Sequence, residues 1–331
     1  MQTPDPGNAP PRWRVALAFA CIYLIWGSTY LAIRFAIETL PPFLMAGLRF
    51  IIAGSILYLI ARLRGAPPPQ RRNWQGAFVV GGLLLLCGNG GVVWAERRVA
   101  SGLAALLVGG VPLYIALLEW LTPRGVRPGR RVTLGLVLGF AGIALLVAPG
   151  NLGGGHVDPI GALALIVGSF MWAAGSLYSR RAPLPESPLL GTGIEMLAGG
   201  TLLLVASAIT GEVRRFDPTA VSARSLAALA YLLVFGSLIG FTAYVWLLRV
   251  VPATRVATYA YVNPVVAVLL GWAVAGEPLA ARTILAAGII IAAVVLVTTS
   301  RVPRAATVPQ LQRAPSMGQG GCKEDAPQRA C

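Results

Sequence analysis

The stretch YAYVNPVVAVLLGW, residues 259–272, places an asparagine and a proline inside an apolar segment long enough to enter a lipid bilayer. A partial echo, GGVPLYIALLEW, occupies residues 109–120 in the first half of the chain. Proline removes one hydrogen bond from a helix, and a side-chain amide is costly to bury without a partner. Two related segments of this kind raise the possibility of a repeated architecture with a functional interior.

The composition around these segments is that of a membrane protein. Of 331 residues, 56% are apolar and only 12% are charged, whereas about a quarter are charged in a soluble protein. Arginine and lysine fall almost wholly outside the apolar runs, so the formal charge of +15 does not indicate nucleic-acid binding. Four cysteines without close spacing suit neither a zinc site nor a disulfide framework. We therefore expect no metal, no cofactor and no nucleic-acid partner.

Ten apolar segments are long enough to cross the hydrocarbon core, which takes roughly 20 helical residues. We expect spans at residues 14–37, 41–62, 74–95, 99–121, 131–148, 159–180, 188–210, 225–248, 254–275 and 281–300. The polar stretch 1–13 lacks the apolar core of a signal peptide, so the first span is expected to be retained. Residues 301–331 lose all periodicity and are expected to form a disordered tail.

The distribution of basic residues predicts the orientation of the chain. If the N-terminus is cytoplasmic, most of the 27 basic residues flank the cytoplasmic ends of spans, and Arg34 and Arg49 lie within spans. The outer loops then hold six basic residues: Arg97, Arg98, Arg214, Arg215, Arg224 and Arg282. We therefore expect both termini, including the tail, in the cytoplasm.

The two halves of the chain repeat each other at two offsets. Offsets of 146 and 152 residues pair Trp26 with Trp172, Arg34 with Arg180, Pro42 with Pro188, Arg49 with Glu195, Gly54 with Gly200, Trp94 with Trp246, Pro112 with Pro264, and Trp120 with Trp272. Each repeat, residues 14–148 and 159–300, holds five spans, and this odd number inserts the second copy upside down. The predicted fold is all-α, with ten transmembrane helices in two inverted five-helix repeats. Many secondary transporters have such repeats and bind substrate near mid-membrane, where the halves meet.

This symmetry suggests a role for the opening stretch. Asn263 lies nine residues into its span, about 14 Å along the helix and close to mid-membrane. Pro264 is expected to break the helix there, and Pro112 to break the fourth span in the same way. Backbone groups freed at that depth are tolerated where they line a cavity or are buried in protein. The two related prolines favour a cavity wall, and the alternative is a packing kink.

Six motifs make the chain resemble the drug/metabolite transporter superfamily, in the ten-span form built from two EamA repeats. They are IWGSTYLAIR (25–34), LPPFLMAGLRF (40–50), GNGGVVWAE (88–96), SGLAALLVGGVPL (101–113), GIEMLAGG (193–200) and TYAYVNPVVAVLLG (258–271). The similarity covers about residues 14–300 and is closest to the YedA-type exporters. It implies a bacterial inner-membrane carrier that exports small organic molecules or metabolites through a central cavity. One departure is that the family's Gly-Glu-Pro, here residues 276–278, has no counterpart at residues 125–127 of the first repeat.

The candidate substrate-binding residues are polar and aromatic side chains expected at membrane depth. They are Trp26, Ser28, Tyr30, Asn89, Tyr114, Trp172, Ser176, Tyr244, Tyr259 and Asn263. Tryptophan and tyrosine normally concentrate at the membrane interfaces, so an aromatic pair such as Trp26 and Tyr30 on one helix face near the middle favours a cavity. The alternative for each residue is ordinary helix packing. For Asn89, which lies between glycines, the alternative is a tight helix crossing.

Arg49 and Glu195 are charged residues expected about 12 Å deep, counted from opposite faces of the membrane. A charge at a helix centre costs roughly 2.5–3.5 kcal/mol, so it usually has a partner or a task. We expect these repeat mates to form an ion pair, or Glu195 to take up a proton when the pair opens. The alternative is two separate structural contacts. Glu96, in contrast, is expected to stay solvated in an outer loop with Arg97 and Arg98.

Together these features predict a secondary-active carrier that works by alternating access on a small-molecule substrate. An aromatic middle with few charges favours amphiphilic or aromatic solutes, and a proton gradient is the expected energy source. The carrier is expected to be a monomer or a homodimer, and the small-residue face of Gly135 and Gly139 suits helix packing or a dimer contact. A channel or a non-transporting scaffold is the alternative. An enzyme is not expected, because the single histidine, His156, lies in a glycine-rich loop with Asp158 as its only nearby acid.

Overall fold

The computed structural model describes residues 11–121, 129–148, 158–251, 256 and 258–299. The expected tail at residues 301–331 and nearly all of the N-terminal stretch therefore lie outside the described residues. No strand occurs among the residues described. The helices are α1 (Arg12–Ala36), α2 (Pro42–Leu63), α3 (Arg71–Gly81), η2 (Gly82–Asn89), α4 (Gly90–Ala95), α5 (Ser101–Val108), α6 (Val111–Leu121), α7 (Arg130–Val147), α8 (Pro159–Ser179), α9 (Pro188–Ile209), α10 (Glu212–Arg215), η3 (Pro218–Ala220), α11 (Ala223–Tyr231), η4 (Leu232–Ile239), α12 (Gly240–Val250), α14 (Tyr259–Ala275) and α15 (Ala281–Thr299).

Nine helical segments of the described chain have the length and apolarity of a membrane span, and Tyr259–Ala275 is a tenth, shorter apolar helix. Three of them begin with a proline at the first helical position, where its missing N–H has no helical partner to lose. Pro42 and Pro188, which the repeat pairs, begin α2 and α9. The expected all-α fold with ten spans is confirmed.

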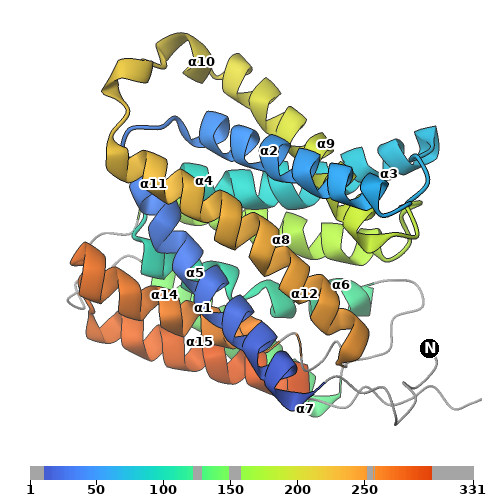
Figure 1. Ribbon diagram of the computed structural model, residues 1–331. Helices are drawn as coiled ribbons and strands as arrows, with labels where there is room; N and C mark the ends of the chain where they lie inside the picture. Colours follow the sequence, from blue (N-terminus) through green and yellow to red (C-terminus); the bar gives the residue numbers. More distant parts are fainter. Residues whose placement is uncertain (1–10, 122–128, 149–157, 252–255, 257, 300–331) are drawn as a thin grey trace, which may run out of the picture. The chain divides into compact units, whose positions relative to one another are not determined.

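The most extensive helix contact joins α2 to α9, which run alongside each other (Figure 1). Glycines hold this contact tight: a Cβ on Gly54 would lie 2.8 Å from the carbonyl oxygen of Gly193, and one on Gly200 would lie 3.1 Å from that of Gly47. Small residues let the two backbones approach closely, as in other membrane helix pairs. The offset of 146 pairs Gly47 with Gly193 and Gly54 with Gly200, so the contact is symmetric between the repeats.

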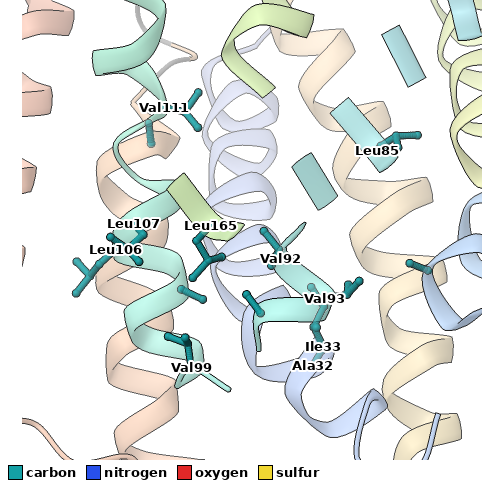
Figure 2. Packing of buried hydrophobic residues seen from close by; sticks show 14 of the residues in the cluster. Ala32, Ile33, Leu85, Val92, Val93, Val99, Leu106, Leu107, Val111 and Leu165 are labelled. Carbon is teal, nitrogen blue, oxygen red and sulfur yellow. The ribbon is translucent and has the colours of Figure 1, made fainter. Parts of the chain in front are cut away.

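The last helices of the two repeats, α7 and α15, form the next largest contact. A Cβ on Gly135 would lie 2.7 Å from Cγ2 of Val297, and one on Gly139 would meet Leu113 and Ala293. The small-residue face expected on the fifth span therefore packs within the chain. Most of the buried interior between the helices is apolar, and Figure 2 shows Val92 and Val93 of α4 close to Ala32 and Ile33 of α1.

Two spans contain a π-helical segment that the sequence analysis did not predict. The third span consists of α3, η2 and α4, and the eighth consists of α11, η4 and α12. With the offset of 152, η2 corresponds to residues 234–241 and overlaps η4, which begins and ends two residues earlier. A π-helical turn holds one residue more than an α-helical turn and is frequent at functional sites. Both repeats therefore depart from regular helix at nearly the same point.

Pro112 and Pro264, which the repeat pairs, have different effects on their spans. In the fourth span α5 ends at Val108, α6 begins at Val111, and Pro112 is the second residue of α6. The ninth span is continuous, because α14 runs through Pro264. The break expected at Pro264 is therefore not observed. Pro264 lies only five residues after the start of α14, and its ring packs at Gly109, where a Cβ would come within 2.7 Å of Pro264 Cγ.

Candidate functional site

An aromatic cluster joins α1, α12 and α14 and consists of Trp26, Phe241, Tyr244 and Tyr259. The Trp26 ring lies 5.2 Å from the rings of Tyr244 and Tyr259 and 5.5 Å from that of Phe241, measured between centroids. Tyr244 and Tyr259 also meet edge to face at 6.0 Å. Three residues that the sequence analysis selected thus come together. It missed Phe241, although Phe241 precedes Tyr244 by three residues and shares its helix face.

The π-helical segment η4 provides the polar partner of Trp26. The N–H of Gly240 bonds to the carbonyl of Phe235 and not to that of Gly236, four residues before it. The Gly236 carbonyl accepts a hydrogen bond from Trp26 Nε1 at 3.2 Å. A Cβ on Gly240 would lie 2.4 Å from the same nitrogen, so only glycine leaves room for the indole. The irregular turn therefore positions the ring at the centre of the aromatic cluster.

Trp172 occupies the equivalent place in the other half. A Cβ on Gly88 would lie 2.8 Å from Trp172 Cε3, and the offset of 152 pairs Gly88 with Gly240. Each tryptophan therefore packs on the π-helical span of the opposite repeat. The next residue, Asn89, buries its side-chain oxygen without a hydrogen-bond partner among the described residues. Such an unpaired acceptor is costly, which makes the Trp172 region a candidate for binding a donor.

Other candidate residues make contacts within the fold. Ser28 Oγ bonds with the Tyr231 hydroxyl at 2.6 Å, and Ser176 Oγ donates to the Trp172 carbonyl at 2.8 Å. Tyr114 is buried and meets aromatic rings of α7 and α8. Tyr30 is half-buried against the apolar core.

Asn263, whose amide lies next to Pro264 in α14, is 7% exposed. In the amide orientation that suits its surroundings, the nitrogen donates to the backbone carbonyls of Tyr23 and Tyr259, each at 3.3 Å. Asn263 thereby links α1 to α14 beside the aromatic cluster. In this conformation the amide supports helix packing, which was the alternative interpretation.

Arg49 and Glu195 form no ion pair in the structure, contrary to expectation. Arg49 is 4% exposed, and its Nε donates to Ser237 Oγ in η4 at 2.8 Å. Its Nη1 is buried without a hydrogen-bond partner in the described chain. Glu195 is half-buried on α9, where its backbone carbonyl lies over Gly81 of α3. The guanidinium turns instead towards η4, where Gly236 leaves room for it.

Glu96 is fully buried, which corrects the expectation that it stays solvated. Neither carboxyl oxygen has a hydrogen-bond partner among the described residues. Arg34 reaches over from α1, but it donates to the backbone carbonyl of Glu96, at 2.5 Å. Burial raises the pKa of Glu96 well above its ordinary value, the charge of Glu277 raises it further, and Arg34 opposes both. Arg97 and Arg98 are exposed, as expected.

Glu277 closes the same end of the helices by capping α5. One carboxylate oxygen accepts from the N–H and Oγ of Ser101, at 2.7 and 2.8 Å, and the other accepts from the N–H of Gly102 at 3.0 Å. A carboxylate is favoured at a helix N-terminus, where N–H groups are unpaired. We call Arg34, Glu96, Ser101 and Glu277 the Glu96 cluster, and the end that holds them the Glu96 end.

Comparison with known proteins gives these features a family. The model of the EamA-like transporter family matches residues 13–148 and 159–299, one match for each half. The chain belongs to the EamA-like transporter family.

Relatives in this family span nearly the same length. The chain is 43% identical over 264 residues to "Uncharacterized inner membrane transporter YedA" of Escherichia coli K12, which covers 80% of this chain and 83% of that protein. It is 26% identical to "Uncharacterized transporter YvbV" of Bacillus subtilis, over 81% and 86% of the two chains. A solved crystal structure with 23% sequence identity shares the fold, with a TM-score of 0.58 over 85% of this chain and 95% of the other.

Glu96 and Glu277 lie in motifs by which the chain resembles this EamA-like family, GNGGVVWAE and Gly-Glu-Pro. Sequence reasoning assigned Glu96 to a solvated loop because two arginines follow it. The sequence did hold a signal for the burial of Glu96, which directly follows the apolar run GGVVWA at residues 90–95. The only polar side-chain group in that run is the indole N–H of Trp94. Among the described residues, no group of three or more histidine, cysteine, aspartate or glutamate side chains could hold a metal ion.

Proposed function

We propose that this EamA-like chain is a secondary-active carrier that exports small organic solutes or metabolites by alternating access. The observation that supports this most is the exchange of tryptophans between the repeats. Trp26 packs on η4 of the second repeat, and Trp172 packs on Gly88 of the first. When two inverted halves make equivalent contacts, each half can adopt the conformation of the other. The solute site then faces one side of the membrane and afterwards the other.

The solute site of the proposal lies between the two tryptophan regions. On one side is the aromatic cluster, and on the other are Trp172 and Asn89. Aromatic faces with a few hydrogen-bonding groups suit amphiphilic or aromatic solutes. Tyr30 and Ser176 belong to the same proposal because they lie on α1 and α8, the helices of Trp26 and Trp172. Tyr114, on α6, belongs to it because its ring meets that of Phe170 on α8.

In the proposal, the protein lies in the inner membrane with both termini in the cytoplasm. The name of the Escherichia coli relative supports the location, and the distribution of arginines supports the orientation. The Glu96 end then faces the outside. Because Glu277 caps α5 and Glu96 is buried there, the conformation described corresponds to a carrier closed to the outside.

Flux measurements with the full-length protein in proteoliposomes test this function. A thermal-shift screen of amino acids, amines and aromatic metabolites first selects the solute, and we expect saturable uptake that shows counterflow. Trp26→Ala should lower this flux by about tenfold or more, because it removes the centre of the aromatic cluster. The matched control is Trp13→Ala, which removes a 63% exposed tryptophan from the same helix and should leave flux unchanged. Flux that does not saturate indicates a channel, and absence of flux for every solute argues against a carrier.

A further inference from the structure

We propose that Glu96 is a proton-binding site whose occupancy keeps the Glu96 end closed. The proposal goes beyond the assignment of a carrier. It rests on the proposed function only where it connects this end to alternating access.

The carboxyl group of Glu96 is buried without a hydrogen-bond partner in the part of the chain that the structure describes. Glu96 has no exposed surface, and both carboxyl oxygens lack a hydrogen-bond partner among the described residues. A carboxylate in such a place would lose its hydration and gain no hydrogen bond, whereas a neutral carboxyl loses far less. The closed arrangement therefore favours the protonated form.

The charged groups around Glu96 are either exposed or engaged in other contacts. On α1, Arg34 Nη1 donates to the backbone carbonyl of Glu96, and Tyr30 is close enough to interact electrostatically with Glu96. After α14, Glu277 holds its charge against the N-terminus of α5. On the segment of Glu96 itself, Arg97 is exposed and Arg98 pairs with Asp158 at 3.3 Å. No ion pair to the Glu96 carboxyl is formed by any of these groups.

The two acids of the Glu96 cluster consequently have different roles. Glu277 accepts three hydrogen bonds, all of which a carboxylate can accept. Its negative charge makes a second charge on Glu96 less favourable. Glu277 therefore holds α5 in place and at the same time favours the proton on Glu96.

A cavity lies at the edge of this cluster. A cavity of about 130 Å³ lies beside Glu277 and is also lined by Arg98, Arg282 and Thr283. This volume is enough for a few water molecules and too small for a metabolite. Water at this place can accept or supply the proton when the helices around Glu96 separate.

The chemical step is a simple transfer. When α1 and α4 move apart, the Glu96 carboxyl meets water, its O–H bond breaks, and the proton passes to water as hydronium. Closing reverses the step, because the carboxylate must recover a proton before it can be buried again. A high pH therefore favours the open Glu96 end and a low pH favours the closed one. In the proposed carrier, one proton is exchanged on this side in each cycle.

Infrared spectroscopy of the full-length protein in lipid nanodiscs tests proton binding without a substrate. At neutral pH we expect a carbonyl stretch from a buried, protonated carboxyl group that disappears in Glu96→Gln. The control, Glu38→Gln, removes an acid at the same end that pairs with Arg224 at 3.4 Å, and it should leave the band unchanged. A wild-type spectrum without this band, or a band that persists in Glu96→Gln, would overturn the proposal.

A labelling experiment tests the connection to opening. The buried Val99 is replaced by cysteine in a variant whose four native cysteines are serine. Maleimide labelling at this position should increase with pH, and this increase should disappear when Glu96→Gln is added. An equal increase in both backgrounds would contradict the link. Neither experiment needs a solute, so their failure is distinct from a failure of counterflow.

Discussion

Arg34 and Arg180 are equivalent residues of the two repeats, yet their surroundings differ. Arg34 donates to the backbone carbonyl of the buried Glu96. Arg180 pairs with Glu119 at 3.0 Å, and the two side chains are 64% and 51% exposed. Because the repeats are inverted, these residues mark opposite ends of the helices. At one end the acid is buried, whereas at the other end both charged side chains are exposed.

The surroundings of Trp26 and Trp172 also differ, in how many of their polar groups are hydrogen-bonded. Trp26 donates to a freed carbonyl and has three aromatic neighbours. Trp172 packs on an equivalent glycine, but its indole N–H makes no hydrogen bond within the described residues, and Asn89 beside it lacks a partner. The two repeats are related by symmetry, but among the described residues hydrogen bonds are complete around Trp26 and incomplete around Trp172. In the proposed alternating access, each of the two conformations is expected to show such a difference between the halves.

The largest effect is expected from the charged mates in the second and seventh spans. Arg49→Met removes a buried, incompletely bonded cation whose burial is costly, so we expect the protein to lose little stability. Flux in proteoliposomes should nevertheless fall by about tenfold or more if the charge serves transport. Thermal unfolding and flux measured on the same preparation separate the two effects. A variant that is equally stable and fully active would make Arg49 purely structural.

The next test is whether the two tryptophan contacts are equivalent. Gly240→Ala and Gly88→Ala each place a methyl group where an indole lies, at 2.4 and 2.8 Å. Overpacking of this kind typically costs about 1–3 kcal/mol, so both variants should unfold at a lower temperature. Gly288→Ala is the control, because no atom lies within 4 Å of its added Cβ. If only one of the two variants is destabilised, the contacts are not symmetric.

The spans and the repeat could be predicted from the sequence, because both depend on local patterns. Apolar length defined the spans, and paired residues such as Pro42 and Pro188 defined the repeat; the structure places both at helix starts. Trp26, Tyr244 and Tyr259 were each selected as binding candidates because aromatic side chains are unusual at membrane depth. The structure brings their rings together, and their role in binding stays a prediction.

What the sequence did not reveal depends on contacts between distant segments. The residues of η4 do not distinguish it from an ordinary apolar helix. Its free Gly236 carbonyl accepts a hydrogen bond from the indole of Trp26 on α1, a contact between distant segments. The burial of Glu96 depends on α1 and on the loop of Glu277, about 60 and 180 residues away in sequence. Arg49 and Glu195 are mates by symmetry, but symmetry relates positions and does not bring the side chains together.

The difference between the two ends can be tested by neutralising one acid at each. Glu277→Gln leaves an amide nitrogen that cannot accept a hydrogen bond, so α5 should lose part of its cap and the protein about 1–2 kcal/mol of stability. Glu119→Gln weakens an exposed ion pair, which is worth about 0–1 kcal/mol. Thermal unfolding of both variants should therefore show the larger shift for Glu277→Gln. Equal shifts would mean that the Glu96 end is not the more tightly packed one.

The smallest effect is expected where the first helices of the repeats begin. At α8, Asp158 accepts hydrogen bonds from the N–H groups of Gly161 and Ile160, whereas α1 begins after Pro11 without a side-chain cap. The bond from Gly161 is the main cause of the lowered pKa of Asp158, to which Arg98 also contributes. A lowered pKa in the folded state means that this stabilisation is present above the ordinary pKa of aspartate and is lost as the pH falls through the lowered value. Asp158→Asn keeps an acceptor oxygen, so the melting temperature should stay near that of the wild type and lose this acid sensitivity. Asp158→Ala should melt slightly earlier than the wild type at neutral pH, and the difference should narrow as the pH falls. If Asp158→Ala melts like the wild type, the cap makes no difference and the two helix starts are equivalent in stability despite their different sequences.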